Sequence, residues 1–331
     1  MKSFVSYFLL LILFFSLVLG DSNSSTDKLP KEFRLNGTAT QDAFGDSKSK
    51  ALHSTVRLTR NDKLIAMGAI ISPEGHILTK ASSCVGAREA TLSGGEKFKL
   101  RVKKRNESLD LALYQMISDR NDFQPVNWND NNASKDVSWI LSAYTELREI
   151  RIGITSGKHR EIGREGGVMG VMLGTESKLG IHITEVIPHA AADKAGVQVG
   201  DVIQKIDGRS VKKRDQVVSI VGKKDPGDVV MMQAMRKENE KNFRITLGHR
   251  SVTFDLFNRN MQMSGPVSKR KDNFPLILQH DLPLPKEAMG GPIFDLNGDC
   301  IGINIARVDR VTCYTLPSKI VYPVVKDFLS Q

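Results

Sequence analysis

The chain has 331 residues, 40% of them hydrophobic, and its 47 lysine and arginine residues against 37 aspartate and glutamate residues give a formal net charge of +10 at pH 7. This length suits two or three domains, and the apolar fraction is ordinary for globular protein. The basic clusters are short, at residues 99–105, 212–214 and 269–271. Because no aromatic residues interleave with them and no nucleic-acid motif accompanies them, we expect no nucleic-acid partner. Solvated faces, with an anionic membrane surface as a neighbour, are the better interpretation.

The first fifty residues divide into two segments. Residues 4–19 form an apolar run that is preceded by Lys2 and is too short to span a bilayer comfortably. Val18 and Gly20 are small enough for a signal-peptidase site, so we expect export with cleavage near Gly20, and an uncleaved anchor is the alternative. Residues 21–50 are polar without apolar periodicity, which indicates a disordered leader.

The three cysteines, Cys84, Cys300 and Cys313, are odd in number and have no regular spacing. This pattern argues against a disulfide framework and against a metal site. We expect buried free cysteines, no metal and no cofactor.

Short strands begin near Ser54. Residues 54–59 alternate, Asn61-Asp62 predicts a turn, and residues 63–72 predict a second strand before another turn at 73–75. Strands at this regular spacing favour a β-barrel over βαβ units.

The stretch KEAMGGPIFD, residues 286–295, resembles the turn that holds the nucleophile in trypsin-fold proteases. Its two glycines, Gly290 and Gly291, allow backbone N–H groups to converge on one point as an oxyanion hole. The residue before them is Met289. A thioether cannot attack a carbonyl to form an acyl intermediate.

Two further segments, GAIISPEGHILT at residues 68–79 and SLDLAL at 108–113, resemble the HtrA (Deg) family of exported serine proteases. The resemblance places the general base at Ser82, the orienting aspartate at Asp110 and the nucleophile at Met289. One member of the triad is therefore retained. Losing the nucleophile or the base typically costs roughly 10⁶ in rate, so triad proteolysis is not expected.

Two other side chains are candidates for a replacement nucleophile or base. Cys84 follows the base position by two residues, and His280 lies where the family has a threonine in a strand. We expect both to be structural, with a thiol or imidazole role as the alternative.

Residues 166–208 resemble a PDZ domain of the kind attached to these proteases. Successive N–H groups in the Met169-Gly170-Val171 loop would capture a peptide's terminal carboxylate, and residues 212–222 would form a helix along the groove. The alternative is a structural PDZ domain whose groove a neighbouring segment fills. The expected peptide-binding residues are Val168, Met169, Gly170, Val171, Val217, Val218 and Val221.

The resemblance implies a mainly β protein with two six-stranded-type β-barrels of the trypsin-like fold and an α+β PDZ domain. The PDZ domain interrupts the protease fold, which is tolerable where its two ends lie close together. Strands expected at residues 251–257 and 274–279 then complete the second barrel. The expected boundaries are 1–20 for the signal peptide, 21–50 for the leader, 51–163 for the first barrel and the start of the second, 164–248 for the PDZ domain and 249–331 for the remainder of the second barrel.

The function implied is that of a catalytically inactive HtrA-like protein. It would bind C-terminal or unfolded peptides in protein quality control, in the periplasm or cell envelope, with secretion as the alternative. Two other functions stay open. One is an active endopeptidase with a non-standard site, and the other is a scaffold or regulator that assembles with itself or with an active paralogue.

Overall fold

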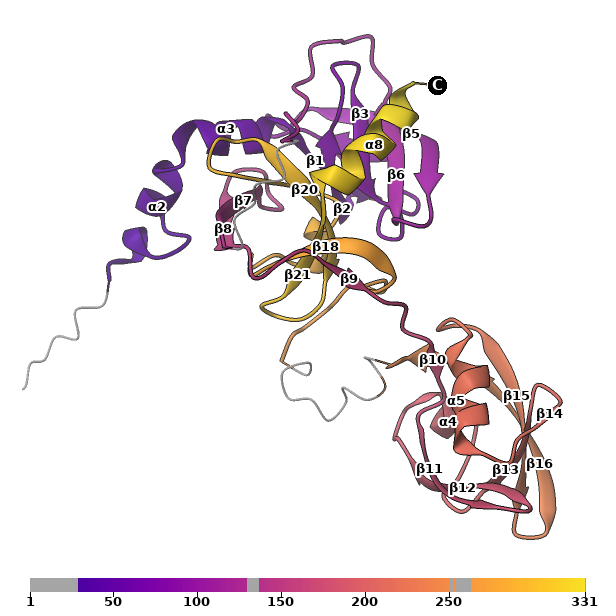
Figure 1. Ribbon diagram of the computed structural model, residues 1–331. Coiled ribbons are helices and arrows are strands. Elements are labelled where there is room, and N and C mark those ends of the chain that lie inside the picture. Colours follow the sequence, from indigo (N-terminus) through magenta and orange to yellow (C-terminus); the bar gives the residue numbers. More distant parts are fainter. Residues whose placement is uncertain (1–28, 130–136, 251–252, 254–262, 331) are drawn as a thin grey trace, which may run out of the picture. The chain divides into compact units, whose positions relative to one another are not determined.

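The computed structural model describes residues 29–129, 137–250, 253 and 263–330 (Figure 1). The expected signal peptide and most of the strand expected at 251–257 lie outside the described residues. The chain divides into two compact units, Met1–Ala43 and Phe44–Gln331. The described part of the first unit holds a 3₁₀ helix, η1 (Lys31–Phe33), and a short helix, α2 (Thr38–Asp42).

The first barrel is closed by six antiparallel strands in the order β1-β2-β3-β6-β5-β4. Asn61 and Asp62, at φ of 50° and 58°, form the predicted turn between the first two strands. Both residue types tolerate this left-handed conformation better than most. The strands are β1 (Thr55–Arg60), β2 (Lys63–Ile70), β3 (His76–Lys80), β4 (Glu89–Thr91), β5 (Lys97–Asn106) and β6 (Leu111–Met116).

The second half of the protease-like fold is a sheet of seven strands in the order β8-β7-β19-β20-β21-β18-β9. The first six strands in this order meet end to end, because Thr155, which follows β8, forms an isolated bridge with His280 in β18. They form the expected second barrel, and β9 pairs with β18 beside it. The strands are β7 (Trp139–Ala143), β8 (Ile150–Ile154), β9 (Arg160–Ile162), β18 (Phe274–His280), β19 (Pro292–Phe294), β20 (Cys300–Arg307) and β21 (Cys313–Pro317).

The polar segment before the first strand is not disordered as far as residue 50. Helix α3 (Gly45–His53) packs with Ala51 fully buried in the apolar cluster that also contains Leu78 and Ile303. The Ser47 hydroxyl donates a hydrogen bond of 2.6 Å to the Leu296 carbonyl oxygen. Few apolar side chains anchor this helix, which is why its sequence shows no amphipathic period. The C-terminal helix α8 (Ser318–Leu329) adds Val321, Val325 and Phe328 to the same cluster.

The inserted domain has a sheet in the order β11-β12-β13-β15-β16, with β14 paired to β13. A separate two-stranded sheet pairs β10 with β17, so that Val168 lies opposite Gly248. The chain therefore enters and leaves this domain at one place, as an insertion into another fold requires. Its elements are β10 (Gly167–Val168), β11 (Val171–Ser177), β12 (Gly180–Val186), α4 (Ala191–Lys194), β13 (Val202–Ile206), β14 (Arg209–Ser210), α5 (Arg214–Gly222), β15 (Val229–Arg236), β16 (Asn239–Thr246) and β17 (Gly248–His249).

Candidate functional site

A buried ion pair occupies the place where the sequence resemblance puts the orienting aspartate. Lys80 is the last residue of β3 and pairs with Leu111 of β6, so Asp110, which precedes β6, lies beside it. Lys80 Nζ is 2.5 Å from Asp110 Oδ2, and the two side chains are 1% and 3% exposed. Burial lowers the pKa of Lys80 from its ordinary value, and the nearby Asp110 carboxylate opposes that shift. Sequence reasoning did not single out Lys80.

Ser82, at the expected base position, also binds Asp110. Its backbone N–H donates to Asp110 Oδ1 at 2.7 Å, and its hydroxyl donates to Oδ2 at 2.8 Å. Lys80 Nζ makes a second hydrogen bond, of 3.2 Å, to the Arg270 carbonyl oxygen. Both carboxylate oxygens of Asp110 therefore accept hydrogen bonds from Lys80 or Ser82. The backbone N–H and the hydroxyl of Ser82 are both directed to Asp110.

Met289 is fully buried in an apolar cluster with Met67, Ile140 and Ile293. It ends a 3₁₀ helix, η3 (Lys286–Ala288), and its carbonyl oxygen accepts a hydrogen bond of 3.3 Å from the Met67 N–H. The thioether thus serves as a core side chain at the expected nucleophile position.

The backbone N–H groups of the expected oxyanion turn all donate within the chain. The Met289 N–H bonds to the Lys286 carbonyl oxygen at 3.2 Å, the Gly290 N–H to that of Asn304 at 2.7 Å, and the Gly291 N–H to that of Ala288 at 3.2 Å. Gly290 adopts φ of 96°, and a Cβ there would collide with the Thr79 hydroxyl and the Met67 carbonyl oxygen. The glycine is required by this close approach to β2 and β3.

His280 and Cys84 are both buried with structural partners. His280 Nδ1 accepts a hydrogen bond from the Leu282 N–H at 3.2 Å, so Nε2 carries the proton and donates to Asn304 Oδ1 at 2.8 Å. Burial lowers the pKa of His280 to about 4, and its hydrogen bond to Asn304 opposes the shift. Burial also disfavours the charged form of Cys84 and therefore raises the pKa of its thiol. The thiol is fully shielded from solvent and donates to the Ala81 carbonyl oxygen. Neither side chain is placed to attack a substrate.

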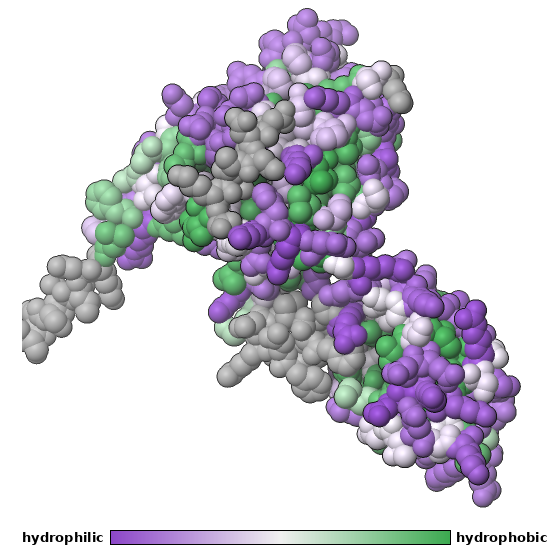
Figure 2. Space-filling view, viewed as in Figure 1, coloured by the Kyte–Doolittle hydropathy of each residue, from purple (hydrophilic) through white to green (hydrophobic). Residues whose placement is uncertain are grey.

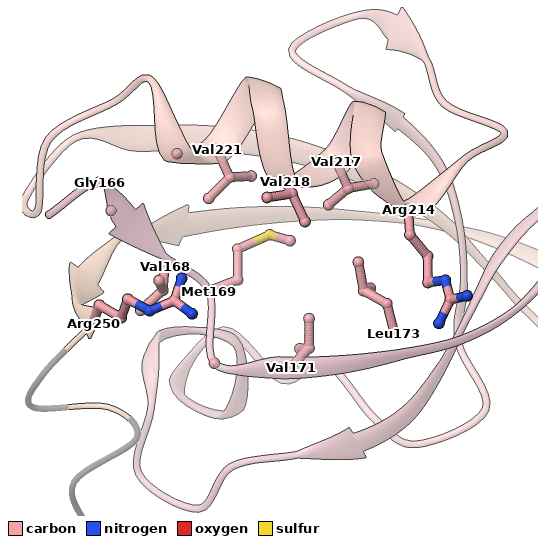
Figure 3. Close-up of a pocket in the computed structure, with 13 residues that line it drawn as sticks. Gly166, Val168, Met169, Val171, Leu173, Arg214, Val217, Val218, Val221 and Arg250 are labelled. Atoms are coloured by element: carbon pink, nitrogen blue, oxygen red, sulfur yellow. The ribbon is translucent and has the colours of Figure 1, made fainter.

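The inserted domain contains an apolar cavity of about 320 Å³ between α5 and β11 (Figure 3). Figure 3 shows Met169, Val217 and Val218 directed into it. In the space-filling view a hydrophobic area lies within the otherwise mostly hydrophilic surface of this domain (Figure 2). All seven expected peptide-binding residues line the cavity, together with Gly166, Gly167, Leu173, Arg214, Gly222 and Arg250, which the sequence did not single out.

The loop at one end of the cavity contains a left-handed glycine. Gly170 adopts φ of 79°, and its carbonyl oxygen accepts a hydrogen bond from the Ile187 N–H at 2.9 Å. Within the described residues, no acceptor is found for the Gly170 N–H. A free N–H at a left-handed glycine beside an apolar cavity can bind a carboxylate oxygen. Among the described residues there is no group of three or more His, Cys, Asp or Glu side chains placed to hold a metal ion.

A closed barrel, a second antiparallel sheet and an inserted domain with its own apolar cavity together define a PDZ-containing protein of protease-like fold. The sequence model of the PDZ domain family matches residues 167–247. Among curated proteins, the chain is 32% identical over 93 residues to serine endoprotease DegS of Haemophilus influenzae, covering 26% of this chain and 27% of that protein. It is 31% identical over 75 residues to a probable periplasmic serine endoprotease DegP-like of Ectopseudomonas mendocina, covering 23% of this chain and 16% of that protein.

Two solved structures are similar to parts of this chain. The MamO protease domain of Magnetospirillum magneticum is 14% identical, with 83% of this chain and 97% of that chain covered and a TM-score of 0.42. The serine endoprotease of Yersinia pestis is 15% identical, with 62% and 97% covered and a TM-score of 0.31.

Residues 167–247 form a PDZ domain, and part of the chain is similar to HtrA-type serine endoproteases. The chain spans about a quarter or less of the length of the curated relatives described above.

Proposed function

We propose that this chain is an HtrA-type pseudoprotease that binds the C-termini of peptides or unfolded polypeptides and does not cleave them. The observation that carries the proposal is the apolar cavity between α5 and β11, which ends at the free N–H of Gly170. A peptide added as a strand beside β11 would place its carboxylate at this loop and its last side chain among Met169 and Val218.

The absence of cleavage follows from what occupies the catalytic positions. Proteolysis by a triad needs a base that accepts the nucleophile's proton and an aspartate that orients the base. Here Lys80 holds Asp110, Ser82 replaces the base, and a buried thioether replaces the nucleophile. The turn's N–H groups are also engaged within the chain, so a tetrahedral oxyanion would find no donors without a rearrangement.

Binding is tested with a C-terminal peptide library, followed by fluorescence anisotropy on the best sequence. The same sequence with an amidated C-terminus is the ligand control. Val218 is 59% exposed and lines the cavity, so Val218→Glu places a carboxylate in the groove without disturbing the core. Val199 is 64% exposed and does not line the cavity, so Val199→Glu is the matched protein control.

We expect Val218→Glu to weaken binding of the free-acid peptide at least tenfold, since the bound peptide would cover the new carboxylate without giving it a partner. We expect Val199→Glu to leave binding within about twofold. The proposal fails if the amidated peptide binds as tightly as the free acid, or if both variants bind alike.

The cell envelope is the proposed location, and protein quality control the proposed role. Support comes from the apolar run at residues 4–19, which we read as an export signal, and from relatives that are described as periplasmic. No helix in the described part of the chain is long and apolar enough to cross a membrane. Secretion of a fusion to an alkaline phosphatase reporter, with and without residues 1–20, tests the export signal. Equal reporter activity in both would contradict it.

Assembly with itself or with an active paralogue remains part of the proposal. Sedimentation of the purified protein and co-purification from its own cells are the measurements that address it.

A further inference from the structure

A second cavity, of about 500 Å³, lies beside the expected base position. Five segments form its wall: the end of β1, the start of β2, the loop after β3 with Ser82 and Ser83, residues 267–269, and the start of η3. None of its lining residues belongs to the PDZ domain. It is therefore a different site from the groove of the proposed function.

Hydrogen bonds hold the wall in place. Ser82 is fixed by its two bonds to Asp110. Two hydrogen bonds of 2.9 Å join Ser268 to Arg307. The Ser268 N–H donates to the Arg307 carbonyl oxygen, and the Arg307 N–H donates to the Ser268 hydroxyl. The cavity is thus bounded by anchored segments on both the first-barrel and second-sheet sides.

The wall carries four cationic side chains and one carboxylate. The cations are Arg60, Lys63, Lys269 and Lys286, and the carboxylate is Glu287. Lys286 Nζ lies 3.9 Å from Glu287 Oε1, and Arg60 Nη1 donates to the Val85 carbonyl oxygen at 3.3 Å.

Lys63 and Lys269 have no such partner. Neither forms an ion pair with any residue in the described part of the chain. The nearest carboxylate in sequence, Asp62, pairs instead with Lys97 at 3.6 Å. Asp110, behind Ser82, is neutralised by Lys80. Two exposed ammonium groups therefore face the cavity from separate segments, with their charge uncompensated.

The rest of the wall is partly apolar. Leu64, Ile65 and Val267 are half-buried there, and Val85 is 52% exposed. Because the two lysines come from different segments with apolar side chains on the same wall, several separate carboxylates suit the site better than one compact anion. Acidic residues alternating with aliphatic ones in an extended peptide provide that arrangement.

We propose that this cavity binds an acidic polypeptide segment that also carries aliphatic side chains, independently of the PDZ groove. The contacts would be Lys63 and Lys269 to carboxylates, and Val85 and Leu64 to aliphatic side chains. Steering by the uncompensated charge would make association faster at low ionic strength.

The test uses a fluorescent decapeptide of alternating glutamate and valine with an amidated C-terminus, which offers the PDZ loop no terminal carboxylate. Its partner is the same peptide with glutamine in place of glutamate. Binding to the full chain is measured by anisotropy for wild type, Lys63→Glu/Lys269→Glu, and the control Lys241→Glu/Arg244→Glu. The control residues are exposed on β16 of the PDZ domain and give the same change in net charge.

We expect the glutamate peptide to bind wild type at least tenfold more tightly than the glutamine peptide. We expect Lys63→Glu/Lys269→Glu to lose this preference and the control to retain it. Lys63→Gln/Lys269→Gln adds no repulsive charge and should also lose most of the preference. This second variant distinguishes loss of the two ammonium groups from misfolding caused by the added glutamates.

The proposal is overturned if the glutamate peptide binds no more tightly than the glutamine peptide, or if the cavity variant and the control lose this preference equally. It is also overturned if tripolyphosphate displaces the peptide and its binding depends on Lys63 and Lys269 in the same way. The last would indicate a compact phosphate site. Because the peptide is amidated, each of these is distinct from failure of C-terminal capture by the PDZ groove.

Discussion

Lys80 Nζ and Asp110 Oδ2 lie 2.5 Å apart with both side chains shielded from solvent, 30 residues apart in the sequence. The lysine lies two residues before the expected base position and engages the carboxylate that would orient a catalytic histidine. A buried carboxylate needs a compensating charge and hydrogen bonds, and here Lys80 and Ser82 provide both. The aspartate at the expected triad position is thus held in a buried ion pair.

Removal of either partner of this ion pair should destabilise the protein strongly. Lys80→Met or Asp110→Asn leaves one charge buried without its partner, and we expect each to lower the free energy of unfolding by about 3–5 kcal/mol. The double variant should lose less than the sum of the two single variants. Urea unfolding followed by fluorescence measures this.

The control is the exposed pair of Lys97 and Asp62, with side chains 58% and 87% exposed. Lys97→Ala should change the free energy of unfolding by less than about 1 kcal/mol. Additive losses at Lys80 and Asp110 would argue against a coupled pair.

His280 should make stability depend on pH. Its pKa is about 4 in the folded protein and 6.5 ordinarily, so between these values the unfolded chain binds a proton that the folded chain does not. This contribution is fully present above pH 6.5 and is lost as the pH falls towards 4, by roughly 3 kcal/mol in total. His280→Gln removes the titrating group. It should reduce the difference between the free energies of unfolding at pH 7 and pH 5 by about 2 kcal/mol.

An unchanged slope in His280→Gln would mean that the imidazole is charged or solvated in the folded protein.

Arg214 should select the residue two positions before the peptide's C-terminus. A peptide with its carboxylate at Gly170 runs antiparallel to β11, and its last and third-from-last side chains share a face. Arg214, the first residue of α5, lines the cavity, and Figure 3 shows it near Leu173 and away from Val168. We therefore expect glutamate at the third-from-last position to bind several-fold more tightly than lysine.

Titration calorimetry with the two peptides measures this preference. Arg214→Ala should abolish it, whereas Glu176→Gln should strengthen it, because Glu176 Oε1 lies 3.7 Å from Arg214 Nε and competes for the guanidinium. A preference that survives Arg214→Ala would assign the selectivity to other residues.

Rebuilding the triad should require more than its two missing members. In Met289→Ser/Ser82→His the new histidine meets an aspartate that Lys80 already holds, so we expect no cleavage of casein. Adding Lys80→Asn removes the ammonium group and so releases Asp110. We expect any cleavage of casein in the triple variant alone and none in the double variant. Cleavage by the double variant would show that Lys80 does not block the site.

Much of the fold could be predicted because its patterns are local. The alternation at residues 54–59 and 63–72 predicted β1 and β2, and the apolar spacing at 212–222 predicted α5 (Arg214–Gly222) within two residues. The ion pair could not be predicted, since a lysine at a strand end is ordinarily solvated and only the pairing of β3 with β6 brings Asp110 to it. Helix α3 was missed because its few anchors, Ala51 and the Ser47 hydroxyl, depend on partners far along the chain.

The most direct test of the central claim is casein cleavage by purified wild-type protein, with labelling by a fluorophosphonate in the same samples and Asp110→Asn as the comparison. Loss of the nucleophile and base leaves roughly 10⁻⁶ of triad activity. We expect no cleavage above background and no covalent label. Wild-type cleavage that disappears in Asp110→Asn would contradict it and would mean that a nucleophile still acts at this site.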